Sequence, residues 1–271
     1  MKTPTFLPLL LSALAVVSTP LRAQDAARPQ PLEHTWTVDG LERKALIHLP
    51  AKPSEKGSPL VFGFHGHGGW AAQAARSFRL HDEWPEAVVI YMQGLPTPGR
   101  LTDPEGKRNG WQSEPGAEGD RDLKFFDAVL ATAKERFKID ETRVYATGHS
   151  NGGGFTYLLW GERPEVFAAV APSAAVAARS ANKLTPKPVL HLASESDPLV
   201  KYSWQSLMIE RVKTVNGCGA EGSAWAEGCT QYPSENGAPL IVFLHDGGHR
   251  YPRAGPALIV KFFKEHSLRR S

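Results

Sequence analysis

Short apolar runs alternate with amphipathic stretches along most of the chain. The runs at 59–64 and 87–91 are almost continuously apolar, which is typical of strands buried on both faces of a parallel sheet. The alternation predicts an α/β fold, with a mostly parallel sheet covered by helices on both faces. Further strands are expected at 143–147, 166–171, 188–193 and 239–244, and helices at 71–80, 122–137, 153–160, 202–215 and 255–266.

Two other features of the pattern stand outside this alternation. Strand-like runs at 35–38 and 43–49 flank an Asp-Gly pair, which predicts an antiparallel hairpin before the first buried strand. The segment 93–119 is long, irregular and rich in proline and glycine, and such loops are often functional. It contains Trp111, for which two interpretations stay open: an aromatic platform for substrate, or local packing.

The first residues have the features of a secretory signal peptide. Lys2 precedes an apolar stretch at 6–17 that is too short to span a bilayer, and a small residue, Ala23, follows at a suitable cleavage point. We therefore expect a signal peptide at 1–23. The remaining residues, 24–271, are expected to form one catalytic domain that is secreted or periplasmic.

The charge balance argues against two classes of partner. The formal net charge of +3 falls to +1 when residues 1–23, which carry two basic residues and no acid, are removed. There is no basic stripe, so nucleic acid is not an expected partner. No later apolar run is long enough for a membrane anchor. We expect a monomer.

The chain has two cysteines, Cys218 and Cys229. Because export would bring them into an oxidising compartment, we expect a disulfide between them, with two free thiols as the alternative. Closing this short loop would stabilise the fold by roughly 3 kcal/mol.

The strongest chemical motif is a G-x-S-x-G pentapeptide that runs from Gly148 to Gly152. It lies between an expected strand and an expected helix, and this context is typical of a nucleophile elbow. The glycines allow close backbone approach around Ser150, whose hydroxyl would then stand above the end of the sheet. An ordinary serine in a glycine-rich turn is the alternative.

Downstream residues offer the acid and the base that a serine nucleophile needs. His249 lies in a glycine-containing loop after the last strand and is the expected base, with His245 as the alternative. Asp197 follows the strand at 188–193 and is the expected acid, ahead of Glu195 and Asp246. The resulting order of serine, acid and histidine is that of α/β-hydrolases.

Two backbone N–H groups are expected to form an oxyanion hole. One belongs to Asn151, directly after the nucleophile, and the other to His67, with Gly66 as the next choice. The H-x-H pair of His65 and His67 could instead suggest a metal site, but the oxyanion interpretation also accounts for the neighbouring glycines. No metal or organic cofactor is expected.

Together these motifs resemble those of secreted feruloyl and acetylxylan esterases (carbohydrate esterase family 1) and of polyhydroxybutyrate depolymerases. The resemblance implies an α/β-hydrolase fold without a large cap domain, with Ser150, Asp197 and His249 as the catalytic triad. It also matches Cys218 and Cys229 to the cysteine loop of that group. The segments that carry it are 65–68, 122–125, 144–153, 196–200 and 247–252.

The expected function is that of a serine esterase, with feruloyl or acetyl esters of plant cell-wall polysaccharide as the first choice of substrate. Hydrolysis of a polyester such as polyhydroxybutyrate, or of peptides, is the alternative on the same fold. A secreted binding module without turnover is the alternative of another class. The ester substrate could be polymeric, because few residues separate the strands at 166–171 and 188–193 and the cleft should be open.

Overall fold

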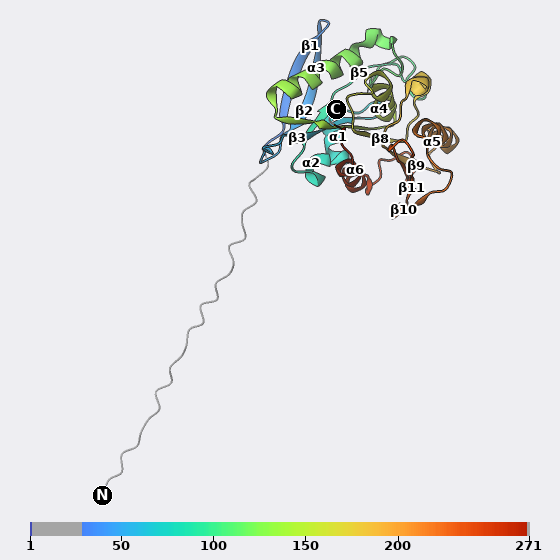
Figure 1. Ribbon diagram of the computed structural model, residues 1–271. Helices are drawn as coiled ribbons and strands as arrows, with labels where there is room; N and C mark the ends of the chain where they lie inside the picture. The colour runs from blue at the N-terminus through green and yellow to red at the C-terminus, as the bar shows by residue number, and fades with distance from the viewer. Residues whose placement is uncertain (2–28, 270–271) are drawn as a thin grey trace.

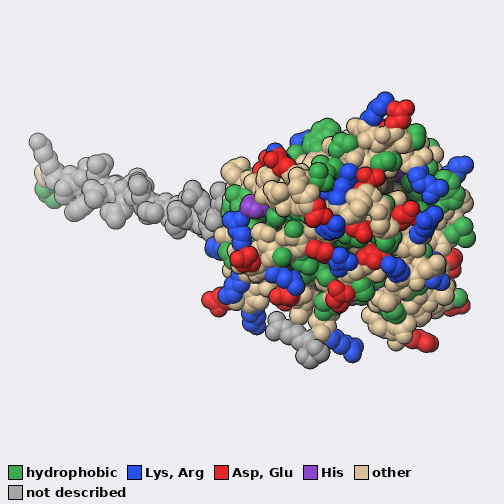
Figure 2. Space-filling model, turned by 90° about the horizontal axis from the view of Figure 1, so that it is seen from above, with side chains coloured by type: hydrophobic (Ala, Val, Ile, Leu, Met, Phe, Trp, Pro, Cys, Tyr) green, Lys and Arg blue, Asp and Glu red, His purple; other side chains and the backbone are tan. Residues whose placement is uncertain are grey.

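The computed structural model describes Met1 and residues 29–269, and all structural statements refer to these residues. Apart from Met1, the expected signal peptide at 1–23 lies outside the described residues. Among the helices that are described, none is both long and apolar enough to cross a membrane. Figure 2 shows basic and acidic side chains interspersed over the face that it presents.

A ten-stranded sheet forms the centre of the molecule (Figure 1). Its strand order is β1-β2-β4-β3-β7-β8-β9-β12-β11-β10. The six middle strands are parallel, and the antiparallel pairs β1–β2 and β11–β10 extend the two edges. The strands are β1 (Leu32–Val38), β2 (Leu41–His48), β3 (Ser58–Phe64), β4 (Val88–Met92), β7 (Ile139–His149), β8 (Ala169–Ser173), β9 (Val189–Ser194), β10 (Ser223–Ala226), β11 (Cys229–Tyr232) and β12 (Leu240–His245).

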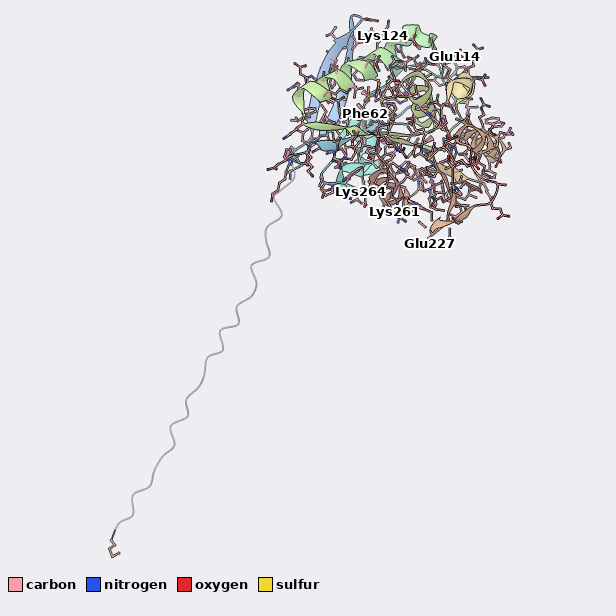
Figure 3. All side chains as sticks on the ribbon, viewed as in Figure 1. Phe62, Glu114, Lys124, Glu227, Lys261 and Lys264 are labelled. Atoms are coloured by element: carbon pink, nitrogen blue, oxygen red, sulfur yellow. The ribbon has the colours of Figure 1, made fainter. Side chains whose placement is uncertain are left out.

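Helices cover both faces of this sheet, because successive side chains of the buried strands point to opposite sides. In β3, Phe62 packs with the core beneath α3, α4 and α5, whereas Val61 packs with the core beneath α1, α2 and α6. Figure 3 shows Phe62 inside the fold, with Lys124 and Glu227 at its periphery. The helices are α1 (Ala71–Phe78), α2 (Leu80–Glu83), α3 (Arg121–Arg136), α4 (Asn151–Glu162), α5 (Tyr202–Asn216) and α6 (Gly255–Lys264), with 3₁₀ turns η1 (Ala117–Asp120) and η2 (Ala178–Lys183).

This architecture confirms the predicted α/β fold with a mostly parallel sheet and no large cap domain. The expected hairpin is also present, and both of its turn residues, Asp39 and Gly40, have positive φ. The strand expected at 166–171 begins only at Ala169, because Val166 N–H closes a turn onto the Arg163 carbonyl.

Two pairs of short strands were not predicted from the sequence. The edge strands β10 and β11 are short and half exposed, so they lack the continuous apolar signal of a buried strand. Within the segment 93–119, two-residue strands β5 (Leu95–Pro96) and β6 (Asn109–Gly110) pair with each other. Strands of this length cannot be recognised from periodicity.

A buried ion pair connects the edge of the sheet to α3. Asp122 accepts hydrogen bonds from Arg43 Nη2 (2.7 Å) and from the Gln112 N–H (2.8 Å), and both charged side chains are fully buried. Arg43 also donates to the Arg121 carbonyl and stacks on the Phe125 ring. This network joins β2, α3 and the loop that contains Gln112.

Asp122→Ala should lower the free energy of unfolding by about 3–5 kcal/mol, because it leaves the Arg43 charge buried without its counter-ion. Urea denaturation of the wild type and the variant measures this loss. Lys124→Ala, on the same helix, breaks the solvent-exposed pair with Asp39 and should leave the urea midpoint almost unchanged. Equal midpoints for the wild type and Asp122→Ala would contradict a stabilising role for the buried pair.

Candidate active site

Ser150 occupies a sharp turn between β7 and α4, as the pentapeptide predicts. Its backbone has φ 55° and ψ −119°, a conformation that a non-glycine residue adopts only at an energetic cost. A Cβ atom on Gly148 would lie 2.3 Å from the Gly152 carbonyl oxygen, and one on Gly152 would lie 2.2 Å from that of Phe64. Both positions therefore require glycine for this strand, turn and helix to pack so closely.

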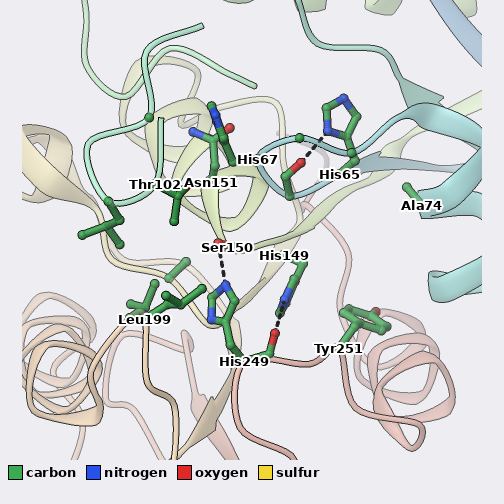
Figure 4. Close-up of a pocket in the computed structure, with 18 of the residues that line it drawn as sticks. His65, His67, Ala74, Thr102, His149, Ser150, Asn151, Leu199, His249 and Tyr251 are labelled. Carbon is green, nitrogen blue, oxygen red and sulfur yellow. Dashed lines mark hydrogen bonds between the residues drawn. The ribbon is translucent and has the colours of Figure 1, made fainter. Parts of the chain in front are cut away.

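The structure brings Ser150, His249 and Asp197 together from three separate loops, and Figure 4 shows the contact between Ser150 and His249. His249 Nε2 lies 2.9 Å from Ser150 Oγ, and His249 Nδ1 lies 2.8 Å from Asp197 Oδ2 and 3.0 Å from Oδ1. Because a carboxylate only accepts hydrogen bonds, Nδ1 carries the proton and Nε2 is free to accept one from the serine hydroxyl. This is the arrangement that activates a nucleophilic serine.

The alternative acids and base lie elsewhere. His245 stacks on Phe243, and its Nδ1 accepts a hydrogen bond from the Gly247 N–H. Glu195 and Asp246 are exposed and line a separate depression beside His245. The last loop turns back towards Ser150 through Gly248, which has φ 63°.

A buried polar chain that the sequence did not reveal supports Asp197. The Asp197 carboxylate accepts hydrogen bonds from the N–H groups of Leu199 and Val200 at 2.8 and 2.9 Å. Gln205 Nε2 donates to Asp197 Oδ2 (3.3 Å) and to the Val200 carbonyl (2.7 Å). This network fixes the carboxylate in the orientation that faces His249.

The chain continues into the core beneath α5. Gln205 Oε1 lies 3.4 Å from His191 Nε2, and His191 Nδ1 lies 2.7 Å from the Tyr157 hydroxyl. All three side chains are fully buried. His191, which lies within β9, is therefore an indirect support of Asp197. Sequence alone gives no signal for Gln205, because a glutamine near a helix start is most often exposed.

His149 also contacts the base. It donates from Nε2 to the His249 carbonyl oxygen (3.1 Å, Figure 4) and accepts from Ser173 Oγ at Nδ1 (3.1 Å). Burial and the adjacent His249 lower the pKa of His149 to about 4, so it stays neutral and keeps this donor at neutral pH. His149 is the second residue of the pentapeptide, and the motif itself predicts no role for it.

The expected oxyanion loop lies against Ser150. A Cβ atom on Gly66 would stand 3.6 Å from Ser150 Cβ, so this backbone passes directly over the nucleophile. Asn151 is the first residue of α4, and its N–H has no carbonyl four residues earlier in the helix to accept it. Among the described residues, no hydrogen bond from the His67 N–H occurs either. Within the described residues, neither expected donor is thus occupied by a hydrogen bond to another protein group.

The side chains of His65 and His67 hold this loop in place. His65 donates from Nδ1 to the Gly66 carbonyl (2.8 Å) and accepts the Gly94 N–H at Nε2 (2.9 Å). His67 Nε2 lies 3.0 Å from Asp103 Oδ2, which lowers the pKa of that carboxyl to about 2. Across the described residues, no group of three or more histidine, cysteine or acidic side chains is arranged to hold a metal ion.

The expectation that Trp111 forms an aromatic platform for substrate is wrong. Its side chain is 0% exposed and packs on Phe64 and Phe155, with ring centroids at 5.3 and 5.1 Å. Its indole N–H donates to the His65 carbonyl, and its backbone exchanges two hydrogen bonds with the Asn151 side chain. Trp111 therefore anchors the segment 93–119 beneath the site, which is the packing alternative.

The expected disulfide is also wrong, since Cys218 and Cys229 are free thiols. Cys218 forms a β-bridge with Ser234, which lies five residues beyond Cys229 along the same extended segment. At about 3.3 Å per residue, the two cysteines stand roughly 16 Å apart. A disulfide needs Cα atoms within about 7 Å.

An elongated pocket of about 1100 Å³ opens onto Ser150. Its walls include Pro98 to Thr102 from the segment 93–119, so that segment forms part of the rim as its length suggested. Figure 4 shows Thr102 and Leu199 on one side of the nucleophile and Ala74 and Tyr251 on the other. The pocket runs past the serine on both sides, so both parts of an ester could be held.

Three buried histidines should make the fold sensitive to acid. Burial lowers the pKa values of His65, His149 and His191 to about 4 from an ordinary 6.5. Between pH 6.5 and 4 the unfolded chain binds more protons at these histidines than the folded chain does. The contribution of the neutral histidines to the free energy of unfolding is therefore complete above pH 6.5 and is lost as the pH falls to 4. Each of the three histidines contributes up to about 3 kcal/mol to this change in the free energy of unfolding.

Urea midpoints measured between pH 7 and 4.5 check this expectation. His191→Gln should reduce the loss of stability over this range, whereas His34→Gln, on the outer strand β1, should not. If the urea midpoint fell by the same amount in both variants and the wild type, His191 would not contribute to the loss of stability in acid.

Comparisons with known proteins agree with this fold. The prolyl oligopeptidase family matches residues 115–208, which is less than half of the chain. Feruloyl esterase D of Neurospora crassa is 26% identical, over 93% of this chain and 90% of its own length.

Two solved structures share the fold at low sequence identity. A thermostable esterase superposes with a TM-score of 0.64 at 19% identity, covering 88% of this chain and 64% of its own. An acetyl xylan esterase from Aspergillus awamori superposes with a TM-score of 0.59 at 14% identity, and the match covers 86% of this chain and 99% of that esterase. The α/β-hydrolase fold and these esterase relatives identify the chain as a carboxylic-ester hydrolase.

Proposed function

We propose that the protein is a secreted serine esterase in which Ser150 is the nucleophile, His249 the general base and Asp197 the acid. The observation that carries the proposal is the continuous hydrogen-bonded line from Asp197 through His249 to Ser150 Oγ. The N–H groups of His67 and Asn151 have no hydrogen-bond acceptor within the described residues, which supports their role as the oxyanion hole.

In the proposed reaction, His249 Nε2 takes the Ser150 proton while Oγ forms a bond to the ester carbonyl carbon. The carbonyl oxygen becomes an oxyanion, which the two backbone N–H groups stabilise by about 3 kcal/mol each. The carbonyl re-forms as the C–O bond to the alcohol breaks, and His249 protonates the departing oxygen. Water, deprotonated by His249, then cleaves the acyl-enzyme in the same way and releases the acid and Ser150.

Feruloyl or acetyl esters of plant cell-wall polysaccharide are the proposed substrates, and polyhydroxybutyrate the alternative polymer. The similarity to Feruloyl esterase D and the open pocket favour the first choice. Incubation with methyl ferulate, acetylated xylan and polyhydroxybutyrate side by side tests it. Release of ferulate or acetate is expected, whereas release of hydroxybutyrate alone would overturn the choice of substrate.

A peptidase is a second candidate, since the prolyl oligopeptidase family matches residues 115–208, which contain both Ser150 and Asp197. A peptidyl-proline 4-nitroanilide and 4-nitrophenyl butyrate distinguish the two. We expect hydrolysis of the ester at a kcat/KM at least about 100-fold above that of the anilide. The reverse preference would replace the esterase proposal by the peptidase.

A further inference from the structure

The pocket at Ser150 has an unbalanced charge. Its lining includes four arginines, Arg100, Arg108, Arg250 and Arg253, and none of its lining residues is an aspartate or glutamate. The whole chain carries nearly equal numbers of basic and acidic residues, 31 and 28, and they intermix over the face in Figure 2. The imbalance is therefore local to the pocket.

Three of these arginines have unused hydrogen-bonding capacity. Within residues 29–269, the side chains of Arg100, Arg250 and Arg253 form no hydrogen bond or ion pair with another protein group, and all three are exposed. A guanidinium presents five N–H donors in a rigid fork that matches a carboxylate. Such groups at the wall of a pocket are available to a ligand.

The fourth arginine is held within its own loop and lies beside the oxyanion loop, and its Nε is 3.7 Å from Asp103 Oδ2. Arg108 Nη2 donates to the Thr102 carbonyl (2.7 Å), and Nη1 lies 3.6 Å from the point where a Cβ on Gly68 would stand. Arg250 follows His249 directly in the chain. The arginines thus lie on two loops, 98–108 and 249–253, which approach the nucleophile from different directions.

The same pocket exposes apolar side chains. Trp70, Leu101, Leu199 and Trp204 are 41–55% exposed, and all four line it. Exposed apolar side chains gathered around a cleft are typical of a binding site. A ligand that matches the whole lining has an apolar body and an anionic group.

We propose that this pocket binds esters that carry a carboxylate, and that the arginines of the two loops recognise that carboxylate. The proposal rests on the esterase function proposed above and names the class of its substrate. An acidic sugar or a dicarboxylic acyl chain has this chemistry. Neutral esters of the same shape are poorer substrates.

Two matched pairs of probes test the proposal, one with the carboxylate on each side of the ester. The acyl pair is 4-nitrophenyl hydrogen adipate and 4-nitrophenyl methyl adipate. The alcohol pair is 3-butyryloxybenzoate and its methyl ester. Each kcat/KM is divided by the rate of hydroxide hydrolysis of the same probe. We expect the anionic probe to be favoured at least about tenfold in one pair, the equivalent of one charge-assisted hydrogen bond.

The double variants Arg100→Met/Arg108→Met and Arg250→Met/Arg253→Met identify the loop responsible. In one of them the ratio of anionic to neutral kcat/KM should fall to about one. Arg136→Met, at the end of α3 remote from the pocket, is the control and should keep the wild-type ratio. A wild-type ratio near one in both pairs, or a ratio that neither double variant changes, would overturn the proposal. Ester hydrolysis that survives Ser150→Ala would instead overturn the esterase mechanism itself.

Discussion

Ser150→Ala should lower kcat for 4-nitrophenyl butyrate by roughly 10⁵-fold or more, because it removes the hydroxyl that His249 is placed to activate. The hydroxyl that is lost lies 2.9 Å from His249 Nε2, and its removal leaves the base without a proton to accept. What remains is the oxyanion loop and the binding pocket, which alone accelerate hydrolysis only modestly.

Spectrophotometric release of nitrophenolate measures this loss, and thermal denaturation shows whether the variant is folded. Ser203→Ala, on the exposed face of α5, removes a similar hydroxyl and should keep the wild-type rate. A Ser150→Ala protein within tenfold of the wild type would exclude Ser150 as nucleophile.

Asp197→Asn should lower kcat by about 10⁴-fold through the tautomer of His249. Asp197 Oδ1 accepts the N–H groups of Leu199 and Val200, so an asparagine would keep its oxygen there and turn its NH₂ towards His249. Nδ1 would then accept rather than donate, and the proton would move to Nε2. A protonated Nε2 in a neutral ring cannot take the proton of Ser150.

Asp246→Asn and Glu195→Gln are the controls for Asp197→Asn. These two acids are the alternative candidates for the triad acid, and both line a separate depression. Both control variants should retain most of the wild-type kcat. If Asp246→Asn lost as much activity as Asp197→Asn, the assignment of the acid would be wrong.

The motif around Ser150 could be predicted well because its signals are local. Glycine is needed at positions 148 and 152 because an added Cβ would lie 2.2–2.3 Å from a backbone carbonyl oxygen. Such a requirement leaves a short, fixed pattern in the sequence. The central strands were predictable for a related reason, since burial on both faces produces uninterrupted apolar runs. The order of acid and base along the chain then led to Asp197 and His249.

The remaining features depend on contacts between distant segments. Gln205 reaches Asp197 only because α5 packs beside the loop after β9, and nothing in its own neighbourhood marks it. The irregular loop around Trp111 favours a position at the surface, yet the ring fills the core between Phe64 and Phe155. The predicted disulfide is wrong for a similar reason. Cys218 and Cys229 are close in sequence, but Cys218 pairs with Ser234, and the extended segment from Cys229 to Ser234 keeps the two thiols apart.

The arginines of the pocket illustrate the same limit. Arg100 and Arg253 are more than 150 positions apart in the sequence and carry no common motif, so their shared position became visible only in the fold. Catalytic chemistry leaves short motifs, whereas substrate preference is distributed over several loops.

Trapping of the covalent intermediate shows directly whether Ser150 is the nucleophile. The protein is mixed with 4-nitrophenyl butyrate, quenched in acid within milliseconds, digested and mapped by mass spectrometry. We expect a butyryl group on Ser150 in the wild type and none in Ser150→Ala. Turnover of the ester with no acyl group on Ser150, or with the group on another residue, would contradict it.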